Sequence, residues 1–187
     1  GKTVEASQED FAPDIVLKDG DEISGPGWTL EAVFTPGHMS NHHCFTLRER
    51  NALFSGDHVM GWNTTIVSPP DGNMGEYLAS LRRCLARDEA VYLPGHGPEI
   101  AKPRPFVRAY LGHRLMRESE IAKCLDSGIA TVPDMVRRMY VHLPEAMHRA
   151  AARSVLAHLE HMVETGRAQC EGAVTAESVF APASPAA

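Results

Sequence analysis

Three times along this chain, a short apolar segment runs into a glycine-containing turn and then into a side chain that can bind a metal. The first segment ends in Thr-Pro-Gly-His at His38, the second in Ser-Gly-Asp at Asp57, and the third in Leu-Pro-Gly-His at His96. Alternation of apolar and other residues predicts a strand with one buried face, and Pro and Gly end such a strand. Each candidate ligand is therefore expected on a loop where a strand ends.

The apolar segments predict a mostly antiparallel sheet with a helix against it. Strands are expected at residues 14–17, 30–34, 43–47, 52–54 and 91–94. The strands at 30–34, 43–47 and 52–54 are joined by short turns, so they should pair antiparallel, with the loops of His38 and Asp57 at the same end. Asn73 can cap an amphipathic helix over 74–87, which should cover one face of the sheet.

Imidazole nitrogens and carboxylate oxygens suit zinc, manganese or iron, so His38, Asp57 and His96 form a plausible partial metal site. The loop over 58–72 starts directly after Asp57 and is longer than most connections. Loops of this length are often functional, which would place Trp62 beside a cleft. The alternative is a packed surface loop closed by Trp62.

The motifs at 35–38, 54–57 and 93–97, with His42 four residues after His38, closely resemble the second half of a metallo-β-lactamase superfamily hydrolase. This resemblance implies that His38 binds the first of two divalent ions and His96 the second. Asp57 would bridge both ions as the catalytic carboxylate. Zinc is expected first, with manganese or iron as alternatives.

Three more side chains are expected near the ions. The resemblance places His42 next to the metal ligands, and the loop that starts after Asp57 should bring His58 and Trp62 beside them or along the cleft. The family's first signature, His-x-His-x-Asp-His, is not found in this sequence. We therefore expect the second half of an αββα sandwich, an α/β fold, in a fragment that is poorly active alone, binds metal weakly and self-associates through its uncovered sheet.

Past residue 102 the pattern becomes helical. Helices are expected at 106–126, 135–140 and 143–165, followed by a hairpin near 167–180. On the first of them, the spacing predicts an apolar stripe of Val107, Tyr110, Leu111, Leu115, Ile121, Ala122 and Leu125. Three helices and a hairpin resemble a winged helix, which the beta-lactamase-like endoribonuclease branch of the superfamily carries at its C-terminus. We expect a hydrolase part at 1–102, a winged-helix domain at 103–180 and a disordered tail at 181–187.

Charge and cysteine content limit the partners and the compartment. Residues 1–103 hold 8 Lys and Arg against 15 Asp and Glu, a balance of −7, which argues against a nucleic-acid platform there. The C-terminal part is only mildly basic, so specific binding of duplex DNA is not expected. Four dispersed cysteines and the lack of a long apolar run favour a cytoplasmic protein that does not enter the membrane.

The expected function is metal-assisted hydrolysis of a small-molecule ester or thioester, or of a phosphodiester such as RNA. A metal-activated water would attack, and the two ions would polarise the oxygen under attack. The contrasting hypothesis is a non-catalytic module, in which the winged helix binds a partner or nucleic acid and the sheet serves as a platform.

Overall fold

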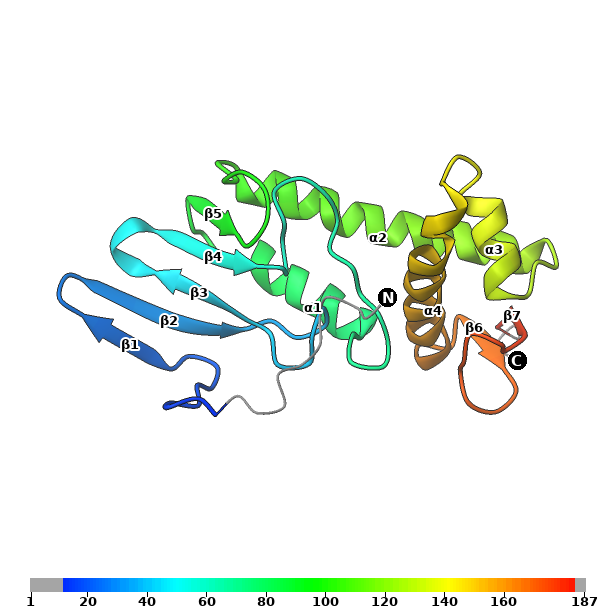
Figure 1. The fold of residues 1–187 in the computed structure, drawn as a ribbon, viewed down its shortest axis with the longest axis horizontal. Coiled ribbons are helices and arrows are strands. Elements are labelled where there is room, and N and C mark those ends of the chain that lie inside the picture. The colour runs from blue at the N-terminus through cyan, green and yellow to red at the C-terminus, as the bar shows by residue number, and fades with distance from the viewer. Residues whose placement is uncertain (1–11, 184–187) are drawn as a thin grey trace.

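A five-stranded mixed sheet forms one end of the molecule in the computed structural model, which describes residues 12–183 (Figure 1). Its strands follow chain order across the sheet: β1 (Glu22–Gly25), β2 (Trp28–Phe34), β3 (His43–Leu47), β4 (Ala52–Gly56) and β5 (Val91–Pro94). Neighbours are antiparallel except β4 and β5, which are parallel and connected through helix α1 (Met74–Leu85). A parallel pair requires such a crossover.

One face of the sheet packs against α1. Each of the strands β2 to β5 buries one apolar residue on this side, namely Val33, Cys44, Leu53 and Tyr92. They meet Tyr77, Leu78 and Leu81 of α1, whose spacing places them on one side of the helix. Asn73 caps α1 as expected, because its side chain accepts a hydrogen bond from the Glu76 amide.

The opposite face of the sheet is also apolar but less covered. Phe45 pairs with Ala32 on one side and with Phe54 on the other, so these three side chains point to the same face. Ala32 is buried, Phe45 is half-buried, and Phe54 is 40% exposed. This face is referred to below as the outer sheet face.

A second group of elements packs around its own core, and helix α2 (Pro103–Asp126) belongs to both cores. Val107 and Tyr110, near its start, join the core under the sheet, whereas Ile121 and Leu125, near its end, join the second core. Figure 1 shows this long helix running from the sheet to the C-terminal elements.

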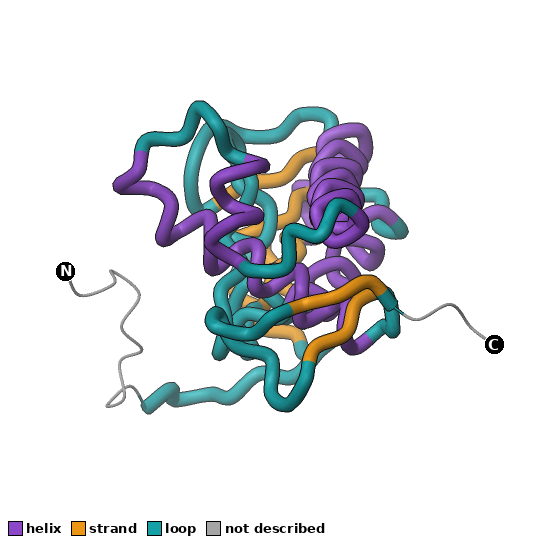
Figure 2. Tube along the Cα trace, turned by 90° about the vertical axis from the view of Figure 1, so that its right-hand side faces the viewer, coloured by secondary structure: helices purple, strands orange, loops and turns teal. Residues whose placement is uncertain are grey.

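The C-terminal elements are those expected from the sequence, with shifted boundaries. They are α3 (Val132–Met139), the short 3-10 helix η2 (Glu145–Met147), α4 (His148–Glu164), β6 (Ala168–Cys170) and β7 (Phe180–Pro182). The two strands pair antiparallel as a hairpin, visible beside the helices in Figure 2. Ala181 and Pro182, assigned to the tail, are part of β7, and 184–187 lie outside the described residues.

Two local predictions are wrong. Residues 14–17 do not form a strand, and Ile15 and Val16 are exposed; the strand that precedes β2 is β1, which pairs with it across the turn at 25–28. Apolar residues alone do not form a strand, because a strand needs a partner. Here the Gly-Pro-Gly turn makes β1, and not residues 14–17, the hairpin partner of β2. Leu115, assigned to the buried stripe of α2, is 45% exposed.

Among the described helices, none is long and apolar enough to cross a membrane.

Candidate metal centre

The structure brings His38, Asp57 and His96 together at one edge of the sheet. They follow β2, β4 and β5, three strands that run in the same direction, so their ends meet at the same edge. Nε2 of His38 lies 4.0 Å from Oδ2 of Asp57, and Nε2 of His96 lies 3.6 Å from Oδ1. The carboxylate therefore stands between two imidazoles, with one oxygen facing each ring.

Two glycines make this approach possible. Gly37 has a φ of 126°, and a Cβ there would lie 2.2 Å from the amide nitrogen of Tyr77 at the start of α1. A Cβ at Gly95 would lie 2.8 Å from Oδ1 of Asp57. A side chain at either position would force the loops apart, which explains why both turns before a histidine contain glycine.

The His38 ring is held from behind by the main chain. Its Nδ1 lies 2.6 Å from the carbonyl oxygen of Ile66. Since a carbonyl can only accept, Nδ1 carries the hydrogen and Nε2 presents its lone pair towards Asp57. Metal-binding histidines in proteins commonly have this arrangement, because the second hydrogen bond fixes the ring and its tautomer.

Asp57 is anchored through its main chain, while its side chain is left partly unpaired. The Thr65 hydroxyl donates to the Asp57 carbonyl over 2.6 Å. Oδ1 is buried and has no hydrogen-bond partner within residues 12–183. A buried carboxylate oxygen without a partner is costly, and a bound cation would satisfy it.

His42 lies next to these side chains, as expected. Its ring centroid is 6.2 Å from that of His38, and its Nδ1 is 2.9 Å from the Thr35 hydroxyl. Burial, with the nearby His38 ring adding to it, lowers the pKa of His42 to about 4. His42 is therefore neutral near pH 7 and adds no positive charge where a cation would have to bind.

His58 and Trp62 differ sharply in position. His58 is completely buried, with its ring edge-on to Tyr77 at 4.9 Å between centroids, so it lies beneath the site and lines no open surface. Trp62 is 72% exposed and lies flat beside His96. Of the two residues, only Trp62 is placed to touch a substrate.

The three candidate ligands fit a pair of divalent ions in part. Their N to O separations exceed a direct hydrogen bond of about 2.7–3.2 Å, and leave room for an ion bound at about 2.0–2.2 Å from each atom. Residues 12–183 nevertheless contain no group of three or more His, Cys, Asp or Glu side chains arranged to hold one ion. Each ion would receive one imidazole and a share of the Asp57 carboxylate, fewer than the three protein ligands usual for catalytic zinc.

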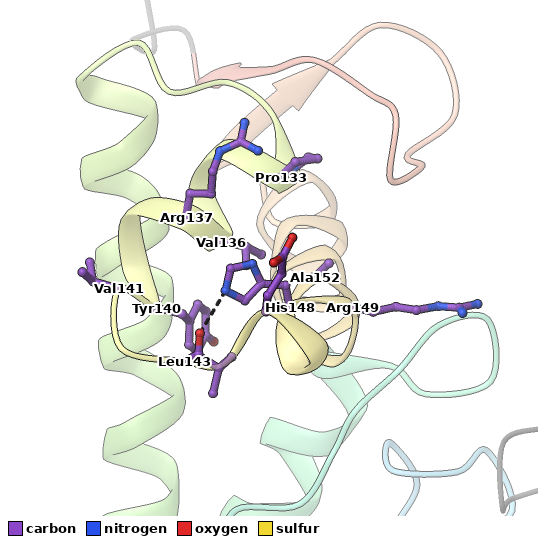
Figure 3. A pocket seen from close by; sticks show the side chains of 10 residues that line it. Pro133, Val136, Arg137, Tyr140, Val141, Leu143, His148, Arg149 and Ala152 are labelled. Carbon is purple, nitrogen blue, oxygen red and sulfur yellow. Dashed lines mark hydrogen bonds between the residues drawn. The ribbon is translucent and has the colours of Figure 1, made fainter. Parts of the chain in front are cut away.

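A separate hollow of about 760 Å³ lies in the C-terminal part, between α3 and the start of α4 (Figure 3). Val136, Tyr140 and Leu143 form its apolar lining, and His148 donates from Nε2 to the Leu143 carbonyl. Its lining includes none of the candidate ligands. The hollow is therefore distinct from the edge of the sheet where Asp57 lies.

Sequence reasoning missed the contacts around the ligands. Thr65 and Ile66 contact Asp57 and His38, and Arg114 donates from Nη2 to the Thr65 carbonyl. Ile66 acts through its carbonyl group, which no sequence pattern reveals. For Arg114 there was a signal, because it lies four residues after Tyr110 and seven after Val107, on the buried side of α2. A charged residue at a core position of an amphipathic helix indicates a buried polar contact.

Two family models match the chain. One, described as metallo-beta-lactamase superfamily, matches residues 3–96, and another, described as beta-lactamase associated winged helix domain, matches residues 131–176. The second match confirms the winged-helix interpretation of the C-terminal elements.

Individual proteins agree with the family models. The chain is 30% identical to the lactamase-like protein adaB of Aspergillus niger, over 91% of this chain and 57% of that protein. It is 33% identical to an atrochrysone carboxyl ACP thioesterase of Aspergillus fumigatus, over 68% of this chain and 43% of that protein. The chain thus spans about half the length of the curated relatives it matches.

The fold recurs in a solved structure of a beta-lactamase domain protein from Burkholderia ambifaria. The TM-score is 0.78 at 24% identity, over 89% of this chain and 52% of that one. This likeness extends across both the sheet and the C-terminal helices. On its motifs, its fold and the match over residues 3–96, the chain belongs to the metallo-beta-lactamase superfamily.

Proposed function

We propose that this protein is a metal-dependent hydrolase of thioesters or esters, with zinc as the first candidate metal and manganese or iron as alternatives. The observation that carries the proposal is the Asp57 carboxylate, which stands between His38 and His96 with one oxygen facing each ring. The relatives named as thioesterases support thioesters ahead of other substrates. Phosphodiesters remain the second substrate class.

In this proposal, His38 and His96 would each hold one ion, and Asp57 would bind both through its two oxygens. When bound, the ions would supply a water of lowered pKa and a Lewis acid for the substrate oxygen. The Ile66 carbonyl keeps Nε2 of His38 free to bind. In this arrangement the described residues would supply two ligands per ion, one imidazole and one carboxylate oxygen.

Trp62 supports an apolar acyl group as substrate. Its indole lies beside His96 and is largely open to solvent, and Ile66 on the same loop is 54% exposed. An exposed aromatic ring next to candidate ligands offers a flat surface on which an acyl chain or an aromatic acyl group can lie.

The test compares Asp57→Asn with Asp88→Asn, which removes the same charge at an exposed position. Zinc affinity is measured by titration calorimetry, and hydrolysis is followed on an aromatic acyl thioester and a generic phosphodiester, with zinc or manganese. Asp57→Asn should weaken zinc binding by at least about tenfold and abolish the hydrolysis that depends on added metal. Losing a metal ligand should reduce the affinity at least as much as losing a residue that only contacts a ligand.

Unchanged zinc affinity in Asp57→Asn would show that the carboxylate is not a ligand. Faster turnover of the phosphodiester than of the thioester would reverse the order of substrates. If the wild type shows no zinc binding at all, this result would favour the non-catalytic module over the hydrolase.

A further inference from the structure

Arg114 is a buried arginine that reaches from α2 to the loop at 58–72. Only 3% of its surface is exposed, and its Nη2 donates to the carbonyl of Thr65. Its guanidinium carbon also lies 5.1 Å from the centre of the Tyr77 ring, a cation–π distance. A fully buried arginine is costly unless its partners are fixed, so this contact holds the loop in one position.

Two residues at the end of this contact meet two of the three candidate ligands. Thr65, whose carbonyl Arg114 binds, donates its hydroxyl to the carbonyl of Asp57 at 2.6 Å. The next residue, Ile66, accepts from Nδ1 of His38 at 2.6 Å. Two consecutive residues therefore contact the main chain of Asp57, through the Thr65 hydroxyl, and the ring of His38, through the Ile66 carbonyl.

Tyr110 gives α2 a second hold on the same loop. It lies one helical turn before Arg114, and its hydroxyl donates towards the carbonyls of Met60, at 2.6 Å, and Asn63. The two contacts bracket the part of the loop between Met60 and Thr65. The loop that starts at Asp57 is thus clamped to a helix that continues into the winged-helix domain.

We propose that Arg114 is a positioning residue of the metal centre, which holds the backbone at Thr65 and Ile66 so that His38 and Asp57 keep their orientation. It touches neither substrate nor metal, and acts through the loop. The inference rests on the proposed function in taking His38 and Asp57 as metal ligands. It adds that the helix leading into the second domain keeps them in place.

The test uses Arg114→Met and Arg114→Lys in the full chain, with Arg108→Met as the matched control. Arg108 lies on the exposed side of the same helix, so its replacement makes the same chemical change away from the loop. The first measurement is the tautomer of His38, read without metal from the ¹⁵N signals of the neutral ring. The second is hydrogen exchange of the His58 and Gly61 amides, which donate to the Ser55 and His96 carbonyls.

In the wild type and in Arg108→Met, His38 should carry its hydrogen on Nδ1. In Arg114→Met the ring should become a mixture of tautomers, and the two amides should exchange faster. Zinc affinity should fall about tenfold, as on loss of an outer contact to a ligand. Arg114→Lys keeps a charged donor, so it should restore part of each change.

The proposal would be overturned if Arg114→Met kept the His38 tautomer and the amide exchange rates of the wild type. It would also be overturned if the wild type bound zinc and Arg114→Met bound it equally well. If Arg114→Met fails to fold, Arg114→Lys and Tyr110→Phe decide, since each weakens one hold on the loop. If no variant binds zinc, the proposed function fails, yet the tautomer and exchange still show whether Arg114 positions His38.

Discussion

The indole of Trp62 lies parallel to the imidazole of His96, with 3° between the two planes and 6.3 Å between the ring centroids. The neighbouring residue, Gly61, donates its amide to the His96 carbonyl at 2.8 Å, which locks the two loops together. An offset parallel pair at this distance is a normal aromatic contact. Trp62 therefore reports on whatever binds to His96.

The first prediction is that tryptophan fluorescence changes when zinc binds, and that Trp62 is the source of the change. Coordination of His96 places a charge beside the indole and fixes the ring against it. Trp62→Phe should lose most of the zinc-dependent change, measured as emission intensity during a zinc titration.

The matched control is Trp28→Phe, which removes the chain's other tryptophan, at the start of β2. This variant should keep the full response. A response that survives in Trp62→Phe and disappears in Trp28→Phe would place the ion away from His96.

The strand ends and candidate ligands could be predicted from the sequence, because local rules determine them. A Pro-Gly pair ends a strand wherever it occurs, and strands joined by short turns pair antiparallel. The contexts of His38, Asp57 and His96 thus predicted that the three would lie at one edge of the sheet, and the structure places them there. Whether they bind metal stays a prediction.

The holding contacts could not be predicted, since they join residues far apart in the chain. Arg114 and Thr65 are 49 residues apart, and the His38 contact uses a carbonyl whose direction depends on the whole loop. The exposed Leu115 has the same cause. Arg114 takes the core position beside it because a polar partner was available, so counting only apolar residues placed Leu115, and not Arg114, on the buried side of α2.

The second prediction concerns the outer sheet face, where Phe54 is 40% exposed and Phe45 is half-buried. Exposed apolar surface of this kind promotes association. We expect the chain to self-associate through this face, and Phe54→Lys to shift it towards the monomer. Sedimentation velocity over a range of concentrations measures the shift.

Met116→Lys is the control, because Met116 is 48% exposed on α2, away from the strands. It adds the same charge but should leave the association unchanged. Equal effects of the two variants would mean that charge alone, and not the outer sheet face, governs association.

The third prediction follows from Glu118, which is buried where α2 meets α4. Its Oε1 lies 2.8 Å from Nδ1 of His161 and 3.5 Å from Nδ1 of His158, and its Oε2 lies 2.6 Å from Arg167. Burial alone would raise the pKa of Glu118, but its contacts with His158, Arg167 and His161 lower it from 4.5 to about 2.

The folded state therefore binds the Glu118 proton less tightly than the unfolded state does. The resulting stabilisation is complete above pH 4.5 and is lost as the pH falls towards about 2. A difference of this size corresponds to about 3 kcal/mol of unfolding free energy. Burial also lowers the pKa of His158. The stabilisation that comes from this shift is lost at a higher pH than that of Glu118, because the loss begins as the pH falls below 6.5.

Urea unfolding between neutral pH and pH 3 separates these contributions when Glu118→Gln is compared with the wild type. Glu118→Gln should be less stable at neutral pH, because it leaves Arg167 and two histidines without their carboxylate, and its stability should change less below pH 4.5. Glu120→Gln, on the same helix but paired with Arg117 at the surface, should follow the wild-type curve. Parallel curves for Glu118→Gln and the wild type below pH 4.5 would show that the buried carboxylate does not couple the helices to pH.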